Sequence, residues 1–295
     1  MGSDVSWVRI PHPPQCSPLV GSDRSCGGPG TVRTTDLASR HGHHHTLSRH
    51  RRRHLRHRPR TRPALPGRRC SVVIGGRRTD LLDQLRTEGF GTVTIDVTDS
   101  ASVDAARDTV LDLLPDLDTV VTMSGIGVPE DLRDPAHFVD AERTIDVNVL
   151  GTIRVVDAFT PHLLARGSGT IVTVSSGIGF LPFPLMASYG ASKAAVHAYS
   201  EALRAQLAGT GVDVAELVPP AVATSMGTSN PNALDLGAFG AEVMTLLAQD
   251  PTPHEVLVQG VLMHRWAERD GTYDDLVAQR SRALATLPGR SGTAA

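Results

Sequence analysis

The chain has 295 residues, 40% of them hydrophobic, which is enough for one large α/β domain or two small ones with a sizeable core. Its formal net charge of -2 hides a division, because residues 1–70 hold 14 of the 29 basic residues and 3 of the 31 acidic ones. No stretch is long and apolar enough for a membrane span or a signal-peptide core, so we expect no membrane association. All three cysteines also lie within residues 1–70, so the rest needs no oxidising compartment and we expect a cytoplasmic protein.

Residues 1–69 form a basic, low-complexity segment that we separate from a domain over residues 70–295. Its end, RHRRRHLRHRPRTRPALPGRR at 49–69, has no periodic apolar face to bury, so we expect it to be disordered or irregular. A functional alternative is a basic tail, because arginine-rich runs bind nucleic acid or anionic surfaces and HGHHH at 41–45 could hold a metal. We do not favour it, since no aromatic residues interleave the basic ones and no Cys-His spacing matches a zinc site.

From Ser71 onward, short β-branched runs alternate with amphipathic segments. Strands are expected at 71–76, 91–97, 118–123, 169–176 and 212–219, and helices at 102–114, 141–165 and 192–208. Regular alternation with nearly continuous apolar strands predicts a parallel sheet covered by helices on both faces, a doubly wound, Rossmann-like α/β fold. Residues 252–279 look helical, which predicts a helical C-terminal extension without a further strand.

A candidate active site lies where the strand at 169–176 ends. Ser176 is its last residue, and Tyr189 and Lys193 follow four residues apart, so they share one helical face. Lys193 is the only lysine in the chain. A neighbouring ammonium favours the phenolate of tyrosine and should lower its pKa, which suits Tyr189 to general acid or base catalysis on a carbonyl or alcohol oxygen. Ser176 could hold that oxygen while a nicotinamide exchanges the hydride.

These residues resemble the short-chain dehydrogenase/reductase family over roughly residues 71–226. The resemblance implies that Ser176, Tyr189 and Lys193 are catalytic, and that Asn148 in NVLG helps to hold a proton-relay water through its backbone. It also implies a homodimer or homotetramer formed through the long helices. The implied cofactor contacts are Arg77, Asp96 and Val97 in DVTD, Met123, Tyr189, Lys193, and Val222 and Thr224 in PPAVAT.

The cofactor preference depends on IGGRR at 74–78. Members of the resembled family that use NAD carry an acidic residue at the end of the second strand, where this chain has Gly76 followed by Arg77 and Arg78. A guanidinium there suits a 2′-phosphate, so we expect NADP rather than NAD, with a small carbonyl or alcohol substrate and no metal. The alternative for Arg77 and Arg78 is a pair of solvated side chains at a strand end. The alternative for the whole protein is a non-catalytic scaffold with this fold.

Several motifs depart from the family pattern. TMSG at 122–125 stands where Asn-Asn-Ala-Gly is usual, so the asparagine that pins that loop is missing, and Pro220 replaces a glycine. The C-terminal part resembles a bacterial branch associated with teichoic-acid D-alanylation operons. The family's central first strand and its glycine-rich phosphate loop have no counterpart before Ser71.

The genetic code suggests an explanation for the missing loop. Shifted by one base, with suitable third bases, RHLRHRPR at 53–60 reads Gly-Thr-Ser-Gly-Ile-Gly-Leu-Gly, and TRPALPGRR at 61–69 reads Leu-Ala-Leu-Arg-Phe-Gln-Ala-Ala-Gly. This is a phosphate loop followed by a helix. We therefore interpret residues up to about 69 as, at least in part, an out-of-frame translation, although no convincing first strand is recovered upstream of residue 49.

Overall fold

The strands form two hydrogen-bonded sheets in the part of the chain that the computed structural model describes, residues 5–6, 71–223 and 231–289. One sheet has the order β1-β2-β3 and the other the order β4-β5-β6-β7. The strands are β1 (Val5–Ser6), β2 (Val73–Gly76), β3 (Gly91–Thr94), β4 (Thr119–Thr122), β5 (Gly169–Val174), β6 (Val212–Val218) and β7 (Glu255–Leu257).

The strands from β2 onward pair in parallel, as the alternating sequence pattern predicts. β2 pairs with β3, and β4, β5, β6 and β7 pair in succession, all in parallel, whereas the two-residue β1 runs antiparallel to β2. The doubly wound α/β class is confirmed. The prediction that residues 252–279 lack a strand is wrong, because β7 lies within them and pairs with β6. Its three residues are too short to give a recognisable strand pattern among helical neighbours.

Helices connect the strands and continue the chain beyond β7. They are α1 (Thr79–Thr87), α2 (Ser100–Leu113), α3 (Phe138–Ile145), α4 (Gly151–Arg166), α5 (Ala187–Leu207), α6 (Leu236–Leu247), α7 (Leu262–Arg265) and α8 (Tyr273–Ser281). The helix expected over 141–165 consists of α3, a π-helical segment Asp146–Leu150 and α4. α4 ends where Gly167 adopts a left-handed conformation with φ 69°, a common way to terminate a helix. None of the helices in the described residues combines the length and apolar character needed to cross a membrane.

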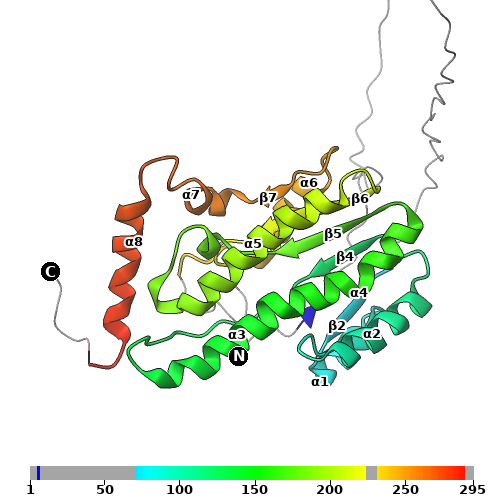
Figure 1. The fold of residues 1–295 in the computed structure, drawn as a ribbon, viewed down its shortest axis with the longest axis horizontal. Helices are drawn as coiled ribbons and strands as arrows, with labels where there is room; N and C mark the ends of the chain where they lie inside the picture. The colour runs from blue at the N-terminus through cyan, green and yellow to red at the C-terminus, as the bar shows by residue number, and fades with distance from the viewer. Residues whose placement is uncertain (1–4, 7–70, 224–230, 290–295) are drawn as a thin grey trace, which may run out of the picture. The chain divides into compact units, whose positions relative to one another are not determined.

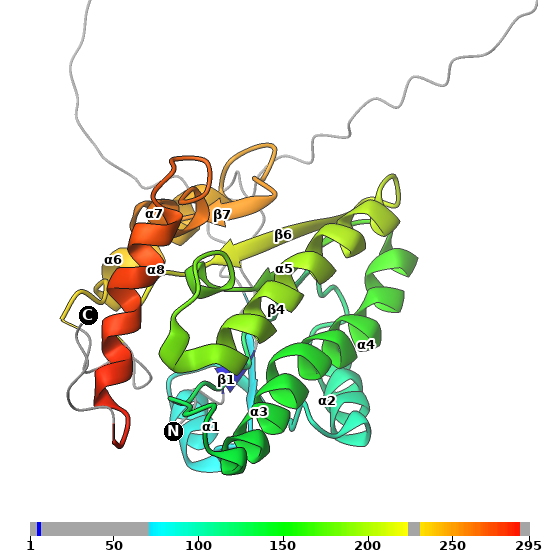
Figure 2. The same ribbon diagram turned by 60° about the vertical axis from the view of Figure 1, so that its left-hand side comes forward.

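The second sheet buries both of its faces, since successive side chains of a strand point to opposite sides. Val120 and Ile171 pack in one core cluster with Phe159 of α4, and their neighbours Val121 and Val172 pack in a second cluster with α6. Figures 1 and 2 show α4 and α5 running side by side over the first of these faces. This layering places the N-terminal end of α5 beside the carboxyl end of β5, where parallel sheets carry their sites.

The predictions for residues 1–69 concern a part of the chain that, apart from β1, lies outside the described residues. Within the described residues, no strand pairing joins β2 to β4, between which the resembled family places its first strand. The missing first strand, the missing phosphate loop and the domain boundary near residue 70 therefore stay predictions.

Candidate active site

Ser176, Tyr189 and Lys193 come together where β5 ends and α5 begins. Ser176 follows β5 and caps the 3₁₀ turn Gly177–Gly179, its Oγ accepting a hydrogen bond from the Ile178 amide at 3.4 Å. Tyr189 lies in the first turn of α5 and forms a side-chain hydrogen bond with Ser176. The serine, the phenol and the lysine thus occupy one site, as the spacing predicts.

Lys193 is buried in this site, with 5% of its surface exposed. Its Nζ donates a hydrogen bond to the main-chain carbonyl of Val174 at 2.9 Å and lies 5.7 Å from the centre of the Tyr189 ring. Burial disfavours the charged ammonium and lowers the pKa of Lys193 to about 8. The lysine is therefore held on the strand end, close to the phenol and poised to change its charge near neutral pH.

The expected effect of Lys193 on Tyr189 is not found. Burial of the Tyr189 side chain raises the pKa of its phenol, and the hydrogen bond with Ser176 only partly opposes that rise. Desolvation of the phenol therefore outweighs the charge of Lys193, whose Nζ donates its hydrogen bond to the Val174 carbonyl. Tyr189 consequently stays protonated at neutral pH and is prepared to donate a proton.

Asn148 lies within the π-helical segment and is completely buried. Its Oδ1 accepts a hydrogen bond from the Ile126 amide at 2.8 Å, and its Nδ2 donates to the Ile126 carbonyl at 2.9 Å and to Ser192 Oγ at 2.9 Å. Asn148 thereby pins the loop after β4, the loop that lacks its own asparagine. Its main-chain carbonyl accepts a hydrogen bond from Thr152 Oγ1 at 2.8 Å, and the expected contact of this carbonyl with a relay water stays a prediction.

Glu130 is a site-supporting residue that the sequence did not reveal. It is buried in the loop after β4, and its carboxylate accepts hydrogen bonds from the Ser188 amide at 2.6 Å and from Ser188 Oγ at 2.7 Å. α5 has no side-chain cap of its own, so this carboxylate takes that place at the positive end of the helix dipole. The residue before Tyr189 is thereby tied to the loop after β4.

Gly179 allows the backbone to pack closely on Lys193. A Cβ on Gly179 would stand 2.9 Å from the main-chain carbon of Lys193 and from the Ala194 amide, so the turn after Ser176 packs directly on α5. A Cβ on Gly125, in the TMSG motif, would stand 3.5 Å from Lys193 Nζ, an ordinary van der Waals distance that does not require glycine. The close approach at Gly179 was not apparent from the sequence.

A second group of predicted residues lies at the ends of β2 and β3. Arg77 and Asp96 form an ion pair with 3.8 Å between the guanidinium and the carboxylate. Burial opposes ionisation of Asp96, but hydrogen bonds from Thr98 and the charge of Arg77 lower the pKa of its carboxyl overall. A small pocket there is lined by Arg77, Ile95, Asp96, Val97, Ser124 and Val147. The guanidinium thus lies in the wall of a small pocket at the ends of β2 and β3.

The remaining predicted contacts are distributed along the strand ends. Met123 follows β4 and packs against the core cluster shared with α6. Val222 forms an isolated bridge with Leu234 beyond β6. Thr224 lies outside the described residues.

Three of the curated relatives are 32–36% identical to this chain. An oxidoreductase of Staphylococcus epidermidis is 36% identical over 161 residues, covering 53% of this chain and 69% of the relative. The NADPH-dependent 1-acyldihydroxyacetone phosphate reductase of Schizosaccharomyces pombe is 32% identical, covering 63% of this chain and 64% of the relative. The oxidoreductase DltE of Bacillus subtilis is 33% identical, covering 52% and 63%. The chain spans about two thirds of the length of these relatives.

Solved structures show the same fold. An alcohol dehydrogenase of Thermococcus sibiricus, complexed with 5-hydroxy-NADP, matches with a TM-score of 0.57 and 26% identity, covering 63% of this chain and 84% of that one. A short-chain dehydrogenase of Streptomyces avermitilis matches with a TM-score of 0.60 over 72% of this chain and 88% of that one, at 23% identity.

The parallel α/β fold and the Ser-Tyr-Lys site at its strand ends define a nicotinamide-dependent oxidoreductase. The family model described as short chain dehydrogenase matches residues 68–235, which is more than half of the chain. The chain belongs to the short-chain dehydrogenase family.

Proposed function

We propose that the protein is an NADP-preferring oxidoreductase that interconverts a small carbonyl compound and its alcohol. The observation that carries this proposal is the position of Tyr189, which hydrogen-bonds Ser176 and lies within 5.7 Å of the Lys193 ammonium at the end of β5. Carbonyl reduction needs a proton donor beside the oxygen that becomes an alkoxide, and this arrangement supplies one.

Each residue has a distinct part in this chemistry. Ser176 holds the substrate oxygen by a hydrogen bond, and Tyr189, whose pKa is raised by burial, donates its proton to that oxygen during reduction. Lys193 places a positive charge beside the phenol and stabilises the phenolate left after proton transfer. Asn148 is a positioning residue, because it joins the loop after β4 to Ser192 on α5.

We infer that a nicotinamide dinucleotide binds along the carboxyl ends of the strands. The adenosine end would lie against the surface beside Arg77, whose guanidinium suits a 2′-phosphate, with Asp96 and Val97 next to it. The nicotinamide end would lie near Tyr189 and Lys193, with Met123, Val222 and Thr224 as further contacts, and when bound it supplies or accepts the hydride. NADP preference is further supported by the S. pombe relative, which is named NADPH-dependent, and by the T. sibiricus structure with an NADP derivative.

The side chains between Ser176 and Tyr189 indicate the general character of the substrate. Phe180, Phe183 and Met186 lie between Ser176 and Tyr189 in sequence and are only partly buried, which favours a substrate with an apolar portion.

We expect a homodimer or homotetramer and a cytoplasmic location, as the sequence analysis predicts.

The proposal is tested with a protein that carries Gly-Thr-Ser-Gly-Ile-Gly-Leu-Gly-Leu-Ala-Leu-Arg-Phe-Gln-Ala-Ala-Gly in place of residues 53–69, because the chain as written has no phosphate loop. It is incubated with NADPH or NADH and a panel of aldehydes and ketones, and the loss of reduced-cofactor absorbance is followed. Tyr189→Phe should lower turnover at least about 1,000-fold, because the acid is lost while the packing of the ring remains. Tyr199→Phe is the matched control, since Tyr199 lies on the same helix but packs against the core, and it should keep its activity. Full turnover in Tyr189→Phe would contradict the assignment, and no turnover in any protein would favour the scaffold alternative.

A further inference from the structure

A row of polar side chains crosses the second sheet beneath α5. Thr173 of β5 pairs in register with Glu216 of β6, which pairs in register with Glu255 of β7, so the three point to the same face. Thr173 Oγ1 lies 2.6 Å from Ser200 Oγ of α5, which identifies this as the face that α5 covers. Such a row interrupts an otherwise apolar layer and therefore needs polar partners.

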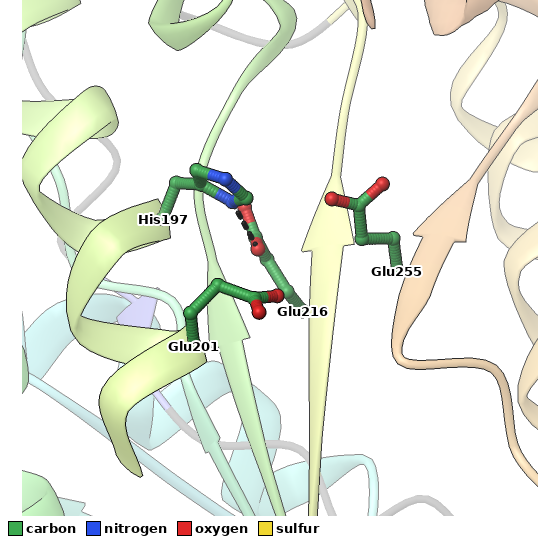
Figure 3. Close-up of side chains that lie close together, drawn as sticks. All are labelled: His197, Glu201, Glu216 and Glu255. Carbon is green, nitrogen blue, oxygen red and sulfur yellow. Dashed lines mark hydrogen bonds and ion pairs between the residues drawn. The ribbon is translucent and has the colours of Figure 1, made fainter. Parts of the chain in front are cut away.

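Two side chains of α5 meet the carboxylates of this row. His197 and Glu201 lie one helical turn apart, and Figure 3 shows them converging with Glu216 and Glu255. Each of the four residues offers one nitrogen or oxygen, and these atoms all lie within 4.8 Å of one another. His197 Nδ1 is 2.7 Å from Glu216 Oε2. We call these four residues the His197 cluster.

The buried carboxylate of Glu216 is the observation that points to a ligand. Its side chain is 0% exposed, and its Oε1 has no hydrogen-bond partner. Buried polar atoms are almost always satisfied, so a carboxylate oxygen left without a partner calls for an explanation. Figure 3 shows this carboxylate beside the imidazole of His197 and near Glu201, and a cation bound by all four residues would supply the missing partner.

The net charge of the cluster and its neighbours is compatible with a bound cation. Arg204 pairs with Glu201, and Arg265 donates three hydrogen bonds to Glu255 at 2.8, 2.9 and 3.1 Å. Three carboxylates and two guanidinium groups leave one negative charge apart from the imidazole, whose pKa the hydrogen bond with Glu216 raises. A divalent ion would replace that excess by a single positive charge, which the exposed edge of the cluster can tolerate because the Glu201 side chain is 54% exposed.

We propose that the His197 cluster binds a divalent transition-metal cation of the Mn²⁺ and Zn²⁺ class. One imidazole nitrogen and carboxylate oxygens are a donor set that these ions accept. Ligand atoms about 2.1 Å from such an ion lie roughly 3–4 Å apart, so small side-chain rotations would close the cluster around it. The ion would connect α5 to β6 and β7, and would thereby stabilise the position of the helix that carries Tyr189 and Lys193.

The test titrates the full chain, stripped with a chelator, with Mn²⁺ alone and follows the free ion by its electron paramagnetic resonance signal. Mn²⁺ is chosen because it prefers oxygen ligands, whereas the cysteines and the HGHHH run of residues 1–70 would also take Zn²⁺. We expect one tightly bound Mn²⁺ per chain, displaced by Zn²⁺, and a higher thermal midpoint when Mn²⁺ is bound. Absence of binding in the unaltered chain would overturn the proposal.

Two variants and one control assign the site. Glu216→Gln should weaken Mn²⁺ binding at least tenfold, and Glu201→Gln should do so without unfolding the chain because Glu201 lies at the exposed edge. Glu268→Gln, an exposed carboxylate outside the cluster, should bind Mn²⁺ like the unaltered chain. If Glu216→Gln does not fold, the Mn²⁺ affinity of Glu201→Gln alone tests the proposal. Unchanged affinity in the folded cluster variants would show that the four residues form only an internal ion-pair network.

Discussion

Asn148 holds the main chain of Ile126 by both of its polar groups, since Oδ1 accepts from the amide at 2.8 Å and Nδ2 donates to the carbonyl at 2.9 Å. The same Nδ2 donates to Ser192 Oγ, which in turn donates to the Tyr189 carbonyl at 2.7 Å. One buried amide therefore connects the loop after β4 with the first turn of α5. The order of the catalytic helix depends on a residue that need not touch the substrate.

Replacing this amide should cost stability as well as activity. Asn148→Ala leaves the Ile126 amide and carbonyl buried without partners, so we expect the free energy of unfolding to fall by about 3 kcal/mol, measured by urea denaturation. Thr152→Val removes a single hydrogen bond to the Asn148 carbonyl and should cost only about 1 kcal/mol. Equal losses of unfolding free energy in the two variants would mean that the Asn148 side chain stabilises the fold no more than a single hydrogen bond does.

The pKa of Lys193 predicts a dependence of stability on pH. Because this pKa is about 8 in the folded protein and 10.5 in the unfolded reference, the unfolded chain binds more protons between these values. The free energy of unfolding should therefore rise with pH, by on the order of 2 kcal/mol from pH 8 to pH 10. Chemical denaturation of the cofactor-free protein across this range measures the rise.

Lys193→Met provides the reference for that measurement. The variant keeps an unbranched side chain but has no titrating group, so the difference in unfolding free energy between the two proteins isolates the lysine. We expect the unaltered protein to gain on the variant steadily from pH 8 to pH 10. A difference that does not change with pH would show that Lys193 is not desolvated in solution.

The predictable part of the site depends on local spacing, and the rest depends on contacts distant in sequence. Tyr189 and Lys193 share a face because helical geometry fixes neighbours four residues apart, and Ser176 ends a strand with a clear β-branched pattern. Glu130 was missed because its partner Ser188 lies 58 residues away. Glu216 was missed because its strand reads as an apolar run, and only the pairing with β7 and the packing of α5 give its carboxylate neighbours.

Cofactor preference should respond to Arg77 more than to its neighbour. Arg77→Asp replaces the cation beside the proposed adenosine site by a carboxylate that suits ribose hydroxyls, so the ratio of kcat/KM for NADPH over NADH should fall at least about 100-fold and reverse. Arg78→Asp makes the same change of charge at an exposed position that does not line the pocket, and should alter the ratio less than about threefold. Matching effects of the two substitutions would reduce the role of Arg77 to general electrostatic attraction.

The last prediction concerns residues 53–69, which lie outside the described part of the chain. In the described residues β4 pairs with β5 along one edge, and no pairing joins its other edge to the β1-β2-β3 sheet. The basic sequence has no glycine-rich run whose backbone amides could receive a pyrophosphate, so we expect the chain as written to bind NADPH weakly despite its intact Ser176, Tyr189 and Lys193.

A second protein carries Gly-Thr-Ser-Gly-Ile-Gly-Leu-Gly-Leu-Ala-Leu-Arg-Phe-Gln-Ala-Ala-Gly in place of residues 53–69. Thermal midpoints of both proteins, with and without NADPH, should show a clearly larger cofactor-induced rise in the second, because only it offers the phosphate loop. An equal rise in both would establish the basic segment as a working part of the cofactor site and would contradict the out-of-frame interpretation.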